Sequence, residues 1–101
     1  MLTFDTYWAQ AGGADPAAAI EKYASKISTT HLKDMRIIND AQVMAEVGEG
    51  NMNFDRIIDT CVKCGIKYHM VEQDIVPADP FDSLAISYKN IMERYGEYFE
   101  K

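Results

Sequence analysis

Short stretches rich in β-branched and aromatic residues alternate along the chain with longer stretches whose apolar residues recur at helical spacing. The short stretches predict strands and the longer ones predict helices. The predicted strands are residues 2–7, 27–32 and 66–74, and the predicted helices follow Asp15, Asn53 and Asp79. The order is therefore β-α-β-α-β-α, which predicts parallel strands joined by right-handed crossovers.

The helix boundaries have their own signals. Asp15-Pro16 and Asp79-Pro80 each put an aspartate at the N-cap and a proline at the first helical position. Asn53 is a third predicted cap, and Gly65 stands where that helix should end. We expect the first helix to run from Ala17 to about residue 26.

Two of the helices carry an apolar stripe at i, i+3, i+4 spacing, which predicts the face that each one buries. The stripe of the middle helix is Phe54, Ile57, Ile58, Cys61 and Val62. The stripe of the last helix is Phe81, Leu84, Tyr88, Ile91, Met92 and Tyr95.

Residues 33–51 show no clear period, so we predict an irregular connection there. Connections of this length are uncommon in compact domains and often functional. The chain has no Asn-Gly or Asp-Gly pair to indicate a hairpin. Gly48-Glu49-Gly50 lacks the spacing and the lysine of a phosphate-binding loop.

Length and charge limit the number of domains and the kinds of binding partner that the chain can have. The chain has 101 residues, a net charge of −6 and a pI near 4.7. This length allows one domain at most, residues 1–101, whereas a complete (β/α)8 barrel needs about 250 residues. An acidic chain repels nucleic acid and anionic lipid, so we expect neither partner.

Two cysteines and no export signal predict a cytoplasmic location. Because a strand-like segment starts at residue 2, we also expect that upstream sequence has been removed.

Each predicted strand has an ionisable residue near its C-terminal end: Asp5, His31 and Glu72. Buried parallel strands are normally apolar, and parallel α/β proteins place their sites at this end of the strands. Carboxylate and imidazole groups suit a divalent ion such as Mn²⁺, Mg²⁺, Co²⁺ or Zn²⁺. The alternative is that neighbouring loops satisfy these polar groups, and the pattern alone leaves both interpretations open.

Four motifs occur in an order and spacing that resemble the C-terminal portion of the xylose isomerase-like TIM-barrel superfamily, which includes sugar phosphate isomerases/epimerases. The motifs are Phe4-Asp5-Thr6-Tyr7-Trp8, His31-Leu32-Lys33-Asp34, Gly48-Glu49-Gly50 with Phe54 after it, and Val71-Glu72-Gln73-Asp74. The resemblance covers essentially the whole chain. It implies an α/β fold of three consecutive βα units with parallel strands, the last part of a (β/α)8 barrel.

The resemblance also implies roles for single residues. Asp5, His31 and Glu72 would be the metal ligands from the last three strands. Glu72 would also move a proton next to the carbonyl of a sugar or polyol, through an enediolate that the metal stabilises. Trp8 would pack against the sugar or wall the pocket, and Arg36 would contact substrate oxygens. These roles belong to a metal-dependent isomerase or epimerase of carbohydrate metabolism, or to a related dehydratase.

The chain also departs from the family pattern. The fourth ligand, a glutamate from an earlier strand, has no counterpart here, so we expect the chain alone to be inactive. A non-catalytic, self-associating α/β fragment is the main alternative, because an open sheet exposes edges and an apolar face; this predicts a homo-oligomer. An endonuclease IV-like nuclease fits less well, because Trp8 stands where nucleases carry a histidine and residues 36–50 contain none.

Other polar residues have simpler interpretations. The C-x-x-C pair Cys61 and Cys64 lies at the end of a helix, where no helix dipole lowers a thiol pKa, so we predict packing for Cys61. His69 points away from Glu72 and is predicted to be structural. Asp34 would orient His31 or Lys33 or join a salt bridge. Asp74 would either support Glu72 or cap the following loop.

Overall fold

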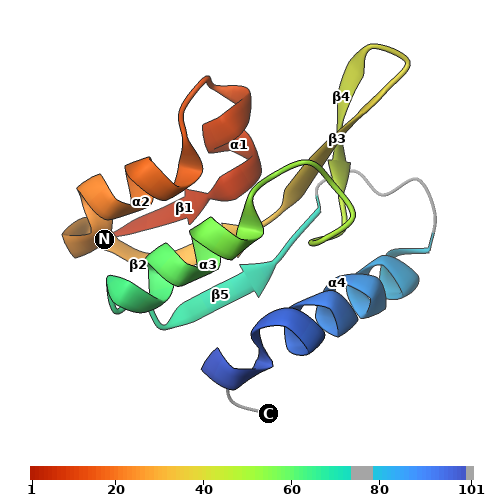
Figure 1. Cartoon of the computed structure of the whole chain (residues 1–101). Helices are drawn as coiled ribbons and strands as arrows, with labels where there is room; N and C mark the ends of the chain where they lie inside the picture. The colour runs from red at the N-terminus through yellow and green to blue at the C-terminus, as the bar shows by residue number, and fades with distance from the viewer. Residues whose placement is uncertain (74–78, 100–101) are drawn as a thin grey trace. The chain divides into compact units, whose positions relative to one another are not determined.

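The computed structural model describes residues 1–73 and 79–99, which contain five strands and four α-helices (Figure 1). The strands are β1 (Leu2–Asp5), β2 (Ile27–Leu32), β3 (Asp34–Ile38), β4 (Ala41–Ala45) and β5 (Tyr68–Val71). The helices are α1 (Thr6–Ala11), α2 (Pro16–Tyr23), α3 (Phe54–Lys63) and α4 (Pro80–Tyr95), with 3-10 turns at Ala24–Lys26 and Gly96–Tyr98. The predicted α/β class with parallel strands is confirmed.

The chain divides into two compact units. The first comprises Met1–Leu32 and Asn53–Met70, and the second comprises Lys33–Met52 with the described residues of Val71–Lys101. Strand order β1-β2-β5 defines one sheet, and β3 and β4 form a separate pair. Within residues 1–73 and 79–99, no helix is long and apolar enough to cross a membrane.

In the first unit, β1 and β2 run parallel with a shifted register. Leu2 pairs with Ile27, but Thr3 pairs with Thr29, so the register moves by one residue between these two pairs. Ser28, the residue passed over, donates a hydrogen bond from its Oγ to the Leu2 carbonyl at 3.4 Å. The shift brings the last residue of β1, Asp5, opposite His31.

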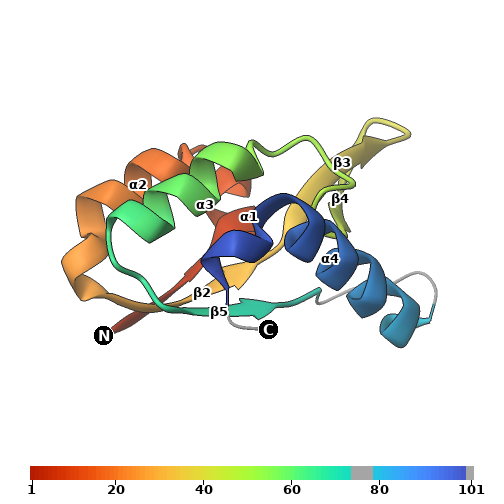
Figure 2. The ribbon, with the colours of Figure 1, turned by 60° about the horizontal axis from the view of Figure 1, so that its bottom comes forward.

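Helices α2 and α3 lie side by side over one face of β1 and β2 (Figure 2). Each fully buried aliphatic side chain at their contact stabilises the fold by about 1.5–3 kcal/mol. The α3 stripe is confirmed at four positions and wrong at Val62, which is 42% exposed. Val62 lies about 80° round the helix from Phe54, at the margin of the buried face. The large buried apolar residues of the two helices are Ile20, Phe54, Ile57, Ile58 and Cys61.

The three predicted helix caps are confirmed. The Asp15 side chain accepts a hydrogen bond from the Ala17 N–H at 3.1 Å, and Asn53 and Asp79 cap α3 and α4 in the same way. After α3, Gly65 has a φ of +73°, which is the left-handed conformation that favours glycine.

Two of the predicted strands and one predicted helix are shorter in the structure than predicted. The first predicted strand included Thr6 and Tyr7, but both lie in α1, because the Asp5 side chain caps the Trp8 N–H and turns the chain. Helix α2 ends at Tyr23 rather than near residue 26, and a 3-10 turn follows it. The third predicted strand, residues 66–74, is limited to β5, and residue 74 lies outside the described residues.

In the second unit, the segment predicted to be irregular contains a β-hairpin, so that prediction was wrong. Strands β3 and β4 pair antiparallel around a tight turn at Asn39 and Asp40. Both turn residues have positive φ, 50° and 64°. A two-residue hairpin turn of this kind needs two left-handed residues, and Asn and Asp tolerate that conformation without glycine.

The loop after β4 folds around one buried carboxylate. Asp34 is 1% exposed, and it accepts backbone N–H bonds from Met35 at 2.8 Å and from Gly48, Gly50 and Met52 at 3.1 Å each. Burial raises the pKa of the Asp34 carboxyl, and the four N–H donors act against that rise. We call these contacts the Asp34 clamp. They give Asp34 a different role from the predicted orientation of His31 or Lys33.

The predicted stripe of α4 is confirmed at Ile91 and Tyr95, near the end of the helix, and wrong at its first three positions. Phe81, Leu84 and Tyr88 are 80%, 46% and 64% exposed. The buried positions instead follow a spacing of four residues along the helix, and they are Ser83, Ser87, Ile91 and Tyr95.

Polar contacts to the loop after β4 explain why Ser83 and Ser87 are buried in place of the larger apolar side chains. The Val47 N–H donates to Ser87 Oγ at 3.0 Å, and Ser83 Oγ donates to Glu46 Oε1 at 3.0 Å. Asn90 donates to the Val47 carbonyl at 2.9 Å. Buried backbone groups must be hydrogen-bonded, so the helix presents its short hydroxyl side chains to this loop rather than its large apolar ones.

We predict that Gly50→Ala destabilises the chain by about 3 kcal/mol or more. An added Cβ would lie 2.2 Å from the Met35 carbonyl oxygen and 2.5 Å from Asp34 Oδ1, inside the clamp. Urea unfolding of the two proteins measures this difference. Gly12→Ala is the matched control, because its φ is −79° and its nearest contact would be 3.3 Å. Equal midpoints for Gly50→Ala and Gly12→Ala would contradict the clamp.

Candidate metal centre

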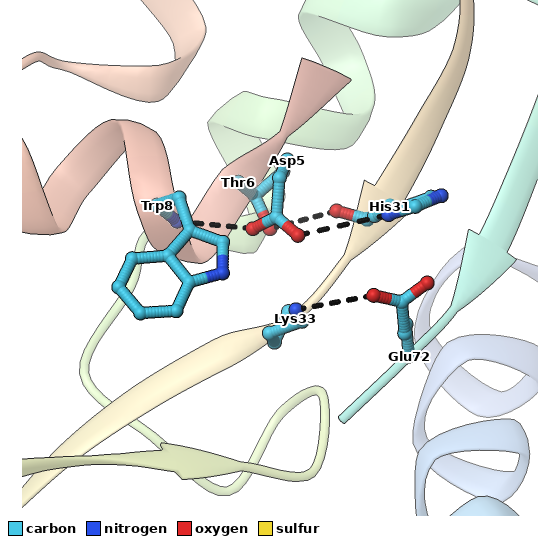
Figure 3. Close-up of polar contacts among 6 residues, drawn as sticks. All are labelled: Asp5, Thr6, Trp8, His31, Lys33 and Glu72. Carbon is cyan, nitrogen blue, oxygen red and sulfur yellow. Dashed lines mark hydrogen bonds and ion pairs between the residues drawn. The ribbon is translucent and has the colours of Figure 1, made fainter. Parts of the chain in front are cut away.

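Asp5 stands at the junction of β1 and α1, where the chain turns from strand to helix. Its Oδ1 accepts the Trp8 backbone N–H at 2.9 Å and so caps α1 (Figure 3). Its Oδ2 lies 3.7 Å from Nδ1 of His31. The side chain is 17% exposed, so the carboxylate is held from one side by the helix and reaches the neighbouring strand on the other.

His31 is the partner of Asp5 in the sheet register. Its side chain is 25% exposed. The Thr6 hydroxyl, fully buried at the start of α1, donates to the His31 carbonyl at 3.2 Å and ties the end of β2 to that helix. Hydrogen bonds to α1 therefore hold both candidate ligands, Asp5 through its side chain and His31 through its backbone carbonyl.

The spacing of Asp5 and His31 fits two ligands of one ion. Ligand bonds to a divalent ion are about 2.0–2.2 Å, which places neighbouring ligand atoms roughly 3–3.5 Å apart. The measured separation of 3.7 Å needs only a small side-chain rotation to reach that range. Partial exposure of both side chains leaves a way in for an ion.

Glu72 follows the last residue of β5 directly, and β5 belongs to the same sheet as β1 and β2. Its Oε1 lies 3.3 Å from Nζ of Lys33 (Figure 3). The Glu72 side chain is 35% exposed, whereas the Lys33 side chain is fully buried. Lys33 was not among the predicted site residues. The signal that could have found it is a lysine directly after a strand of the parallel sheet, where a buried charge needs a partner.

Among the described residues, Asp5, His31 and Glu72 are a set of carboxylate and imidazole groups that could hold a metal ion. Such sets also occur without an ion, so the assignment as ligands stays a prediction at this point.

The two predicted substrate contacts have different settings. Trp8 lies on α1 rather than on a strand, is 52% exposed, and packs edge-on against Tyr7 with ring centroids 4.9 Å apart. Arg36 lies on β3. Its Nε is buried and has no hydrogen-bond partner within the described part of the chain. Neither role in substrate binding is tested by these observations.

His69 has the structural setting that was predicted for it. Its Nε2 donates to the Ile66 carbonyl at 3.1 Å, so Nδ1 is the ring atom that accepts from the Thr30 hydroxyl. Burial lowers the pKa of His69, and the bond to Ile66 acts in the opposite direction. The ring is held neutral between the sheet and the turn before β5.

The cysteines form no disulfide. Cys61 is fully buried on α3. Burial, with a smaller contribution from Cys64, raises the pKa of its thiol to about 12. A thiol with that pKa is not a nucleophile at neutral pH, so packing explains Cys61.

Two crystal structures described as sugar phosphate isomerase/epimerase from Parabacteroides distasonis are similar to this chain. One has 25% identity and a TM-score of 0.69, and covers 90% of this chain and 30% of that chain. The other has 29% identity and a TM-score of 0.69, and covers 94% of this chain and 31% of that chain. The chain thus spans about three tenths of the length of the structures that it matches. Comparison with protein-family models and with curated proteins finds no match.

We predict that the chain loses stability as pH falls below 6.5, through His69. Because its pKa in the folded state is lower than in the unfolded state, the unfolded state takes up the proton first. Its stabilising effect is fully present above the unfolded pKa of 6.5 and is lost as pH falls toward the folded pKa. Unfolding in urea at several pH values measures this loss, which should be smaller in His69→Asn. An NMR midpoint for His69 above 6.5 would contradict the prediction.

Proposed function

Because the chain has the fold of part of a sugar phosphate isomerase/epimerase, we propose that it is the C-terminal part of a divalent-metal-dependent sugar or polyol isomerase or epimerase. The observation that carries the proposal is the pairing of Asp5 and His31 at adjacent strand ends, 3.7 Å apart. This end of parallel strands is where barrel enzymes build their sites.

In this proposal Asp5, His31 and Glu72 hold one divalent ion. Two supporting observations concern the fixed ends of the strands: Asp5 is anchored by its cap on α1, and His31 by the bond from Thr6. Glu72 is joined to β5 in the same sheet without an intervening loop. A mixed oxygen and nitrogen set suits Mn²⁺, Mg²⁺, Co²⁺ or Zn²⁺.

The proposed chemistry is proton transfer beside a carbonyl group. A bound divalent ion supplies positive charge next to the substrate oxygens. The Glu72 carboxylate removes a proton from the carbon next to the carbonyl and returns it, which interconverts isomers or epimers. Trp8 offers an exposed aromatic face to a sugar, and Arg36 offers its guanidinium to substrate oxygens. A further acid or base group would come from outside this chain, so the chain alone would not turn over substrate.

We predict that the chain binds Mn²⁺ and that His31→Asn weakens binding by about 100-fold or more. Loss of an outer partner of a ligand already costs about 10–100-fold, so loss of a ligand itself should cost at least the upper figure. Electron paramagnetic resonance of free Mn²⁺ during titration with protein gives the affinity.

His69→Asn is the matched control, because the chain has two histidines and His69 is engaged by Thr30 and Ile66. It should bind Mn²⁺ like the unsubstituted protein. Equal affinities of His31→Asn and the unsubstituted chain for Mn²⁺ would contradict the proposed ligand set.

For catalysis, we predict that Glu72→Gln abolishes the exchange of solvent deuterium into a ketose. The exchange would be measured on a protein that contains this chain within a complete barrel.

A non-catalytic, self-associating fragment is the second candidate. It is supported by the exposed face of β5, where Tyr68 and Met70 are 70% and 56% exposed. Large apolar side chains in a row on one strand face favour association.

We expect the double substitution Tyr68→Ser, Met70→Ser to reduce the mass of any oligomer, because it removes the apolar side chains from that face. Light scattering during gel filtration measures the mass. A monomeric unsubstituted chain at a concentration of about 100 µM would count against self-association, because a dimer with a Kd of about 1 µM would be mostly assembled at that concentration.

A further inference from the structure

Lys33 is the largest of the fully buried side chains in the described part of the chain. It is the single residue between the end of β2 and the start of β3. Lysine is almost never fully buried unless it is paired. Its ammonium lies 3.3 Å from Oε1 of Glu72, the residue proposed above as ligand and base.

Lys33 needs the ion pair more than Glu72 does, because the two side chains differ in their exposure to water. The Glu72 side chain is 35% exposed and can be solvated without its partner. The Lys33 side chain is 0% exposed, so its charge has been taken out of water. Removal of a charge from water is costly, and an unbranched apolar side chain such as methionine would fill the same space without that cost. The ammonium therefore contributes a directional contact to Glu72 rather than apolar packing.

We propose that Lys33 is a positioning residue that fixes the orientation of the Glu72 carboxylate toward the metal. The inference rests on the proposed function. A glutamate has several rotatable bonds, and its carboxylate keeps one orientation only where a partner restrains it. Lys33 directly follows β2, two residues after His31, and its side chain is fully buried, so its ammonium restrains the Glu72 carboxylate from the strand end that carries His31. Partners of this kind, which touch a ligand and not the ion, typically set metal affinity.

The direction in which Lys33→Met changes the affinity for Mn²⁺ distinguishes a positioning role of Lys33 from a purely electrostatic effect of its charge. A positive charge beside a ligand repels a cation, so its removal by Lys33→Met should tighten Mn²⁺ binding if charge alone matters. If Lys33 positions Glu72, the same substitution should weaken binding by about 10–100-fold. Lys67→Met is the matched control, because it removes the same charge from an exposed position.

Mn²⁺ titrations followed by electron paramagnetic resonance compare the unsubstituted chain, Lys33→Met and Lys67→Met. Weaker binding only in Lys33→Met, with the fold retained by circular dichroism, supports the positioning role. Equal or tighter binding in Lys33→Met overturns it, while the proposed metal site stands. No Mn²⁺ binding by the unsubstituted chain overturns the proposed metal site and this inference with it.

A second measurement on the unsubstituted chain applies if Lys33→Met does not fold. A persistent contact should give a Lys33 ammonium signal in slow exchange with water, with a through-bond NMR coupling to the Glu72 carboxyl carbon. A fast-exchanging Lys33 ammonium without that coupling would overturn the inference.

Discussion

The register of β1 against β2 is the constraint on which the candidate site depends. If the pairing of Leu2 with Ile27 continued without a shift, Asp5 would lie opposite Thr30. Side chains alternate between the two faces of a strand, so a slip of one residue moves a partner to the other face. Thr30 faces His69 instead, inside the first unit. The irregularity at Ser28 therefore decides that a carboxylate and an imidazole stand together at the strand ends.

Local chemistry was enough to predict much of the fold. The Asp-Pro pairs and Asn53 located the starts of three helices, because a cap acts on backbone groups only two or three residues away. The strand-end pattern also placed Asp5 and His31 near the C-terminal ends of two neighbouring parallel strands, since an ionisable residue at such a position is visible in the sequence. The register that brings these two residues together depends on a bulge, and no local pattern indicated it.

The errors come from partners that are distant in sequence. The buried face of α4 is set by Ser83 and Ser87, which meet backbone and side-chain groups about forty residues earlier, and helical periodicity contains no such information. The Asp34 clamp and the Lys33 contact to Glu72 are of the same kind. The hairpin turn was missed for a different reason: Asn39 and Asp40 adopt positive φ, where glycine was expected.

The Asp34 clamp also has a consequence for how this fold can vary. It joins the base of β3 to the loop that follows β4, so the hairpin between them is closed by bonds that do not involve its tip. An insertion between Asn39 and Asp40 would add only loop-closure entropy, which grows slowly with length. The hairpin tip is thus a suitable place to graft a peptide tag or a fluorescent reporter, and the position where related proteins should differ most in length.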